Sequence, residues 1–201
     1  MLNAAHKNGL CSQIELRRPR PEAVTPLRFF HPAEAQRIID HSAPHLARQL
    51  RFVLSTGAHP GELFNLRWNA FDLETGQVSL PSYDAKVSVI LPSELLGDLV
   101  RHGDQTQLVF GHHDGRRYAL KEDSGGQNKT SLRTSARRAR MVPFTLTHVR
   151  QTWATWYLAL HGYDALLYAA RWSSERSAAR YRAIPSETLA TIRQALLSEQ
   201  M

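Results

Sequence analysis

Apolar residues recur every three to four positions along most of the chain after residue 27, a spacing typical of helices that bury one face. Prolines near the start of several of these segments, and Gly57 and Gly162 after two of them, support this interpretation because these residues favour helix ends. The pattern predicts one helix that begins near residue 32 and others over about residues 45–55, 62–68, 92–101, 130–140, 146–161, 164–170, 175–182 and 186–198.

Two short stretches, residues 77–81 and 87–91, are rich in β-forming residues instead, and a turn-like segment over 82–86 separates them. We expect them to pair as an antiparallel hairpin. Residues 108–110 form a further short extended piece, which a polar loop over 111–128 follows. The predicted fold class is mainly α, with a small antiparallel β-hairpin or three-stranded sheet on one side.

The first 26 residues differ from the rest of the chain. Residues 14–26 contain three prolines and three arginines, a composition that disfavours regular structure and suits an extended basic linker. The chain as a whole is 42% hydrophobic, which is enough to bury a sizeable core in one domain. We therefore expect a linker over residues 1–26 and one compact domain over residues 27–201.

Composition narrows the class of partner. The chain has 25 Lys and Arg against 18 Asp and Glu, and the formal charge of +7 favours a polyanion such as nucleic acid. Its single cysteine, Cys11, excludes an internal disulfide and favours a reducing compartment. No apolar run approaches the roughly 20 residues of a membrane span, so we expect a cytoplasmic protein without a membrane partner.

One helical stretch upstream of Arg150 is strongly basic. Its exposed cations are candidates for contacts to DNA phosphates, and a solvated helix face is the alternative. These cations are Lys129, Arg133, Arg137, Arg138 and Arg140. The ten histidines show no metal-ligand spacing, so no metal site is expected.

Two windows together resemble the phage integrase, or tyrosine recombinase, family over about residues 27–185. The first, residues 54–73, is similar to the family's box, in which Thr-Gly-x-Arg-x-x-Glu-Leu precedes Leu-Arg-Trp and an Asp-Leu pair. The second, residues 146–155, is similar to the family's His-x-x-Arg helix, and Trp172 and Tyr181 follow it nine positions apart. Their order, and the 91-residue separation of His59 from Arg150, argue against coincidence.

The resemblance implies a role for each residue that matches the family's motifs. Tyr181 would be the nucleophile, and Arg150 would be the second of two arginines that clamp the scissile phosphate. Trp172 falls where the family has His or Trp, and its indole N–H would donate to a non-bridging oxygen. Glu62 matches the acidic residue that buttresses the first arginine, and Lys86 is the candidate for the general acid on the leaving 5′ oxygen.

Two family positions hold other residues. His59 replaces the first clamp arginine, and Thr147 stands where the family has a histidine. His148 is the remaining candidate for that histidine, although on a helix it would point about 100° away from residue 147. Loss of one preorganised donor costs roughly 3–4 kcal/mol, so we expect impaired recombinase activity. Part of this loss would be recovered if Glu62 or bound phosphate kept His59 protonated.

The resemblance also implies partners. They are double-stranded DNA and further copies of the chain, with the helix over 186–198 docked onto a neighbouring copy. Packing within the chain explains the apolar stripe of that helix equally well. No metal or nucleotide cofactor is implied, because a covalent phosphotyrosine conserves the bond energy. In the family a core-binding domain precedes the catalytic domain, and residues 1–26 would include at most a remnant of its last helix.

Two other classes of function stay open. A catalytically inactive DNA-binding remnant or regulator would keep the fold and the basic surface, and like the recombinase it would associate with the nucleoid. The second alternative is a structural or interaction protein whose basicity is incidental.

Overall fold

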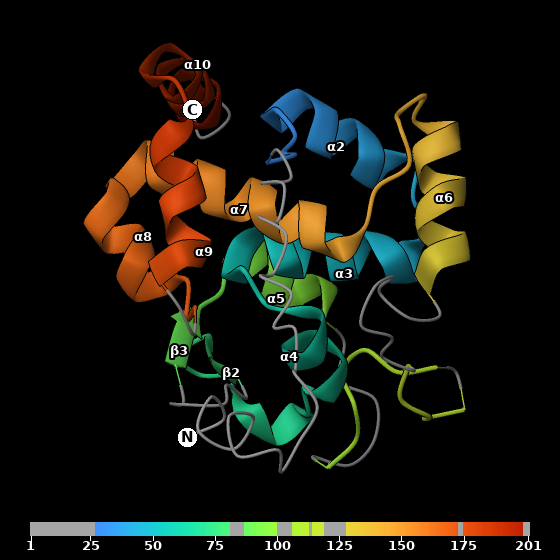
Figure 1. The fold of residues 1–201 in the computed structure, drawn as a ribbon. Coiled ribbons are helices and arrows are strands. Elements are labelled where there is room, and N and C mark those ends of the chain that lie inside the picture. Colours follow the sequence, from blue (N-terminus) through green and yellow to red (C-terminus); the bar gives the residue numbers. More distant parts are fainter. Residues whose placement is uncertain are drawn as a thin grey trace, which may run out of the picture.

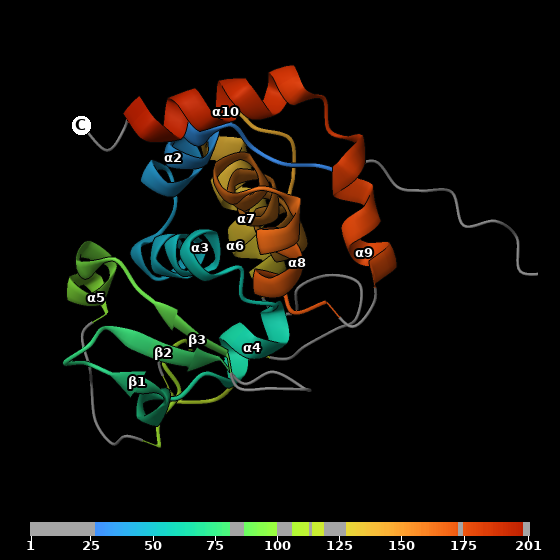
Figure 2. The same cartoon turned by 90° about the vertical axis from the view of Figure 1, so that its left-hand side faces the viewer.

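The computed structural model describes residues 27–80, 87–99, 106–112, 114–118, 128–172 and 175–198. Most of it is helical, and helix α7, Leu146–His161, runs through the middle of the helical part (Figure 1). A small sheet lies to one side of the helices (Figure 2). The predicted linker over residues 1–26 lies outside the described residues.

The first two predicted helices are present as α2, Pro32–Asp40, and α3, Pro44–Thr56. Each begins with a proline, because the fixed φ of proline suits the first helical turn. Gly57 ends α3 at a φ of 65°, a conformation that favours glycine. A Cβ at Gly57 would also collide with the Trp153 ring of α7. This glycine therefore allows α3 and α7 to pack closely and turns the chain toward His59.

The helix predicted over residues 62–68 has other bounds in the structure. It is α4, Pro60–Asn65, which begins two residues earlier than predicted and ends three residues earlier. The side chain of His59 caps the helix and Pro60 occupies its first position, so the start lies ahead of the apolar periodicity. Leu66 is extended, with φ −66° and ψ 130°, and a 3-10 turn, η1, Trp68–Ala70, follows.

The predicted hairpin is confirmed as β2, Gln77–Leu80, and β3, Val87–Ile90, which pair antiparallel. A two-residue strand that the sequence pattern did not predict, β1, Phe71–Asp72, pairs with β2 and gives the order β1-β2-β3. Helix α5, Ser93–Asp98, follows the sheet; residues 100–105, which the prediction included in part, lie outside the described residues. Leu108 forms only an isolated antiparallel bridge with Arg67.

From Lys129 onward the described residues are mainly helical, as predicted. Helix α6 spans Lys129–Arg138, and α8, Tyr163–Ala169, follows α7 directly. The helix predicted over 175–182 is divided, because α9, Glu175–Ala179, tightens into a 3-10 turn, η3, Arg180–Ala183. The extended Ile184 then precedes Pro185, a position where helical conformations are disfavoured.

The last helix, α10, Ser186–Ser198, lies across α7 and α2 of the same chain (Figure 2). Ile192 is completely buried, and Leu189 packs against a cluster that includes Trp153 and Tyr181. In this structure Leu189 and Ile192 of the apolar stripe therefore pack within the chain, whereas Leu197 is 48% exposed. Along the described parts of the chain, no helix is both long and apolar enough to cross a membrane.

Candidate active site

A pocket of about 160 Å³ lies where three distant segments of the chain meet. It contains four of the candidate catalytic residues, namely His59, Arg150, Trp172 and Tyr181. The full lining, which we call the Tyr181 pocket, is His59, Pro60, Thr147, Arg150, Gln151, Trp172, Ser177, Arg180 and Tyr181. Packing of α4, α7 and the α9–η3 segment thus brings together side chains that are up to about 120 positions apart.

His59 lies at the N-terminus of α4, and its ring is part of the helix cap. The Nδ1 atom accepts a hydrogen bond from the backbone N–H of Gly61 at 3.1 Å, which leaves the proton of the neutral ring on Nε2. Partial burial lowers the pKa of His59, Arg150 lowers it further, and Glu62 opposes them. At neutral pH, His59 can therefore donate one hydrogen bond into the pocket but supplies no full charge.

Glu62 has two partners within the site. Its carboxylate accepts a hydrogen bond from the backbone N–H of His59 at 2.6 Å and forms an ion pair with Arg171 at 3.2 Å. The side chains of Glu62 and Arg171 are 10% and 5% exposed, so both charges are buried. Glu62 is thus held against the backbone of His59, and its cationic partner is Arg171.

Arg171 was missed by the sequence analysis. Its guanidinium also donates to the carbonyl oxygen of Ala169 at 3.0 Å and to those of Thr56 and Gly57 at 3.4 Å. The residue adopts a φ of 51°, which is uncommon for a residue other than glycine. Only an indirect signal in the sequence pointed to Arg171. Because His59 replaces the arginine that the family has beside Glu62, the buried carboxylate of Glu62 needs a cation from another part of the chain.

Arg150 brings a desolvated positive charge to the pocket. Its Nη2 donates to the carbonyl oxygen of Ala170 at 2.8 Å, and its buried Nε has no hydrogen-bond partner among the described residues. Burial lowers the pKa of Arg150, Glu62 opposes this, and Arg171 adds to it. An arginine stays charged under these conditions, so this guanidinium is suited to an anion that enters the pocket.

Tyr181 is 4% exposed and stacks on Trp172, with the ring centroids 5.1 Å apart and the planes 21° apart. Burial raises the pKa of Tyr181 to about 12, although Arg180 and Arg150 act in the opposite direction. The hydroxyl is therefore protonated at neutral pH. The stacking fixes the ring relative to the indole.

Position 147, and not position 148, faces this site. Thr147 lines the Tyr181 pocket, whereas the ring of His148 accepts a hydrogen bond from the backbone N–H of Thr145 at 3.2 Å and closes a capping box on α7. The structure does not bring His148 to the other candidates. The hydrogen bond of His148 to Thr145 gives His148 a structural role, that of capping α7.

Replacing His148 with glutamine is expected to make the fold less sensitive to acid. Burial, and then the charge of Arg28, lower the pKa of His148, so below about pH 6.5 the unfolded chain binds a proton that the folded chain resists. Stability is therefore lost as the pH falls, by about 1 kcal/mol for one cap. Glutamine accepts the same hydrogen bond without titrating.

Urea unfolding of the two proteins near pH 7.5 and near pH 5 measures this difference. The exposed His45 of α3 provides the matched control, His45→Gln. Equal losses of stability on acidification for the wild-type chain and His148→Gln would exclude the capping histidine as the cause.

The remaining predicted residues lie elsewhere. Lys86 is outside the described residues. The basic residues of the α6 region are all exposed, and α6 lies on the opposite flank of the molecule from α8 and α9 (Figure 1). These residues are Lys129, Arg133, Arg137, Arg138 and Arg140. In the described parts of the chain, no group of three or more His, Cys, Asp or Glu side chains is arranged to hold a metal ion.

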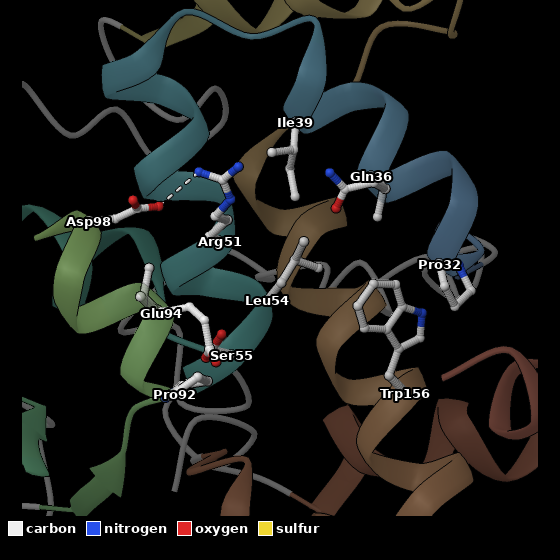
Figure 3. Close-up of a pocket in the computed structure, with 12 residues that line it drawn as sticks. Pro32, Gln36, Ile39, Arg51, Leu54, Ser55, Pro92, Glu94, Asp98 and Trp156 are labelled. Carbon is white, nitrogen blue, oxygen red and sulfur yellow. Dashed lines mark hydrogen bonds and ion pairs between the residues drawn. The ribbon is translucent and has the colours of Figure 1, made fainter. Parts of the chain in front are cut away.

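A larger pocket, of about 430 Å³, lies between α2, α3, α5 and α7 (Figure 3). Its lining combines apolar side chains such as Leu54 and Trp156 with the Arg51–Asp98 ion pair, whose atoms are 3.0 Å apart. None of the predicted catalytic residues that the structure describes lines this pocket. The convergence of candidates, and not the pocket's size, therefore identifies the site.

No protein-family model matches the chain. The integrase of Salmonella phage P22 is 26% identical over 141 residues, which are 65% of this chain and 36% of the integrase. Among solved structures, XerA recombinase has a TM-score of 0.66 at 18% identity and is matched over 89% of this chain and 66% of its own. The catalytic domain of bacteriophage HP1 integrase has a TM-score of 0.57 at 20% identity, and the match covers 83% of this chain and 94% of that domain. The chain thus spans about a third of the P22 integrase.

Proposed function

We propose that this chain, which has the fold of tyrosine recombinase catalytic domains, breaks and rejoins DNA strands through a 3′-phosphotyrosine intermediate. The fold and the family resemblance expected from the sequence are confirmed by the similar structures and by the P22 integrase. On this proposal, residues 27–201 form the catalytic domain and the substrate is double-stranded DNA.

The convergence on the Tyr181 pocket is the observation that carries the proposal. A tyrosine, an arginine, an indole and a histidine line one space of about 160 Å³. A cavity needs about 10–15 Å³ of space open to the centre of a water molecule in order to hold one, so a space of about 160 Å³ has room for a phosphate group. An incoming phosphate would meet hydrogen-bond donors from three segments of the chain.

The strand-cleavage step follows from this arrangement. The hydroxyl oxygen of Tyr181 forms a bond to phosphorus and releases its proton to solvent, the P–O5′ bond breaks, and the 5′ oxygen takes up a proton, for which Lys86 is the proposed donor. Arg150 would donate to the non-bridging oxygens, and Trp172 and His59 would each offer an N–H. Because His59 is neutral, we propose that cleavage is slower than with two clamp arginines.

A covalent trapping experiment tests the proposal. Incubation with a pool of nicked duplexes of randomised sequence is expected to give an adduct that survives detergent, because the nick releases the 5′ product and prevents rejoining. Tyr181→Phe is expected to give no adduct while its DNA affinity stays close to that of the wild-type chain. Binding without any adduct would instead support the inactive remnant, and absence of both would support an interaction protein.

The basic face of α6 is proposed to contact DNA phosphates. Replacing Arg133 and Arg137 with glutamine is then expected to lower the slope of log affinity against log salt concentration by about 2, since each phosphate contact contributes about 0.9. Arg48 and Arg193, which are exposed on α3 and α10, allow a control that removes the same charge. An equal change in slope for both double variants would argue against a specific role for α6.

We also propose that copies of the chain assemble on DNA and that α10 then exchanges onto a neighbouring copy. The support is its short apolar contact, centred on Ile192, which an equivalent surface on a second copy would offer equally well. Sedimentation of the chain with and without a duplex tests assembly. One chain per duplex at saturation would leave α10 packed within its own chain.

A further inference from the structure

One face of the α9–η3 segment is directed at the Tyr181 pocket. Ser177, Arg180 and Tyr181 all line it, and their spacing of three and four positions places them on the same side of a helical segment. Arg180 therefore faces the same space as the tyrosine that the proposed function makes the nucleophile. No motif in the sequence singles out Arg180.

The position of Arg180 matters because the pocket needs positive charge to bind a phosphate. A phosphodiester carries a negative charge that is spread over its non-bridging oxygens, and further charge develops there as phosphorus is attacked. His59 stands where a first clamp arginine was expected, and it is neutral at neutral pH. Arg150 alone would then face this anion, unless Arg180 supplies the second guanidinium.

Two neighbouring arginines do not line the Tyr181 pocket as Arg180 does. Arg182 is exposed and its guanidinium lies over the ring of Tyr163, 4.3 Å from the centroid. Arg171 is buried in its ion pair with Glu62 and does not line the pocket. Of these three arginines, Arg180 is the one whose place in the pocket allows it to touch a phosphate.

The electrostatic effect on Tyr181 agrees with this geometry. Burial raises the pKa of Tyr181, and Arg180 opposes that rise more strongly than Arg150 does. The charge of Arg180 therefore acts on the oxygen that would bond to phosphorus.

We propose that Arg180 is a catalytic residue that binds a non-bridging oxygen of the scissile phosphate opposite Arg150, in place of the charge that His59 does not supply. This inference rests on the proposed function. Arg180 takes no part in the proton transfers. It stabilises the negative charge on the phosphate oxygens while Tyr181 bonds to phosphorus and the P–O5′ bond breaks.

Single-turnover adduct formation by Arg180→Ala and Arg182→Ala tests the inference. The nicked duplex is used with either a normal phosphate or a methylphosphonate at the scissile position, because a methyl group in place of one oxygen removes the negative charge. On the phosphate, Arg180→Ala is expected to be slower than the wild-type chain by roughly 10²-fold, and Arg182→Ala to match the wild-type chain. On the methylphosphonate, the difference between Arg180→Ala and the wild-type chain is expected to become small.

The possible outcomes separate the inference from its premise. Equal slowing of Arg180→Ala on both substrates would indicate a structural defect and overturn the inference, as would a rate equal to that of Arg182→Ala. Partial recovery of the phosphate rate by Arg180→Lys would support it. No adduct from the wild-type chain on either substrate would overturn the proposed function itself, and the inference with it.

Discussion

Replacing Arg150 with alanine is expected to slow formation of the covalent DNA adduct by about 10²–10³-fold, which corresponds to roughly 3–4 kcal/mol of transition-state stabilisation. The reason is that Arg150 brings a desolvated guanidinium to the Tyr181 pocket, and its buried Nε has no partner among the described residues. Equilibrium affinity for DNA should fall much less, because one phosphate contact is a small part of a large interface.

Rates of adduct formation with saturating enzyme measure this effect. Arg51→Ala is the matched control, since Arg51 lies in an exposed ion pair with Asp98 on the α3–α5 side of the molecule. Arg150→Lys should retain part of the rate, because lysine keeps the charge but not the two parallel N–H donors. A rate for Arg150→Ala within a few-fold of the control would remove Arg150 from the proposed mechanism.

Replacing Arg171 with methionine is expected to destabilise the fold by about 3–5 kcal/mol. The substitution leaves the carboxylate of Glu62 buried without its cation and also removes donors to the carbonyl oxygens of Thr56, Gly57 and Ala169. The loss is large because a buried charge without a partner pays most of its desolvation cost.

Urea unfolding at neutral pH measures the change in the free energy of unfolding. The double variant Glu62→Gln, Arg171→Met should recover much of the loss, because it removes both charges together. Arg51→Met, at the exposed pair with Asp98, should cost less than about 1 kcal/mol. A double variant no more stable than Arg171→Met would show that the pairing of charges is not what makes Arg171 necessary.

Local patterns predicted most of the elements correctly. Helix α7, with Gly162 after it, and the β2–β3 hairpin follow from periodicity and turn residues that lie next to one another in the sequence. Strand β1 did not follow, because two residues are too few to show a period and their pairing depends on β2. The division between α9 and η3 likewise depends on how Tyr181 packs under Trp172 and on the exit toward Pro185.

The candidate site was also predicted only in part from the sequence. Arg150, Trp172 and Tyr181 could be named from the sequence because their order and spacing match a motif, and residue types and intervals are properties of the chain itself. The direction in which each side chain points could not be predicted from the sequence. His148 and Thr147 are adjacent, yet the turn of α7 sends one to a helix cap and the other to the pocket.

The sequence by itself therefore determined the helical class of the chain, its resemblance to the tyrosine recombinases and the identity of the nucleophile candidate, since these depend on residue types and short-range spacing. Only the tertiary structure decided that Glu62 pairs with Arg171 and that Arg180 lines the Tyr181 pocket. Such contacts join segments that are far apart in the chain, and they depend on how each helix is rotated and packed against α7. No local pattern of residues specifies that rotation.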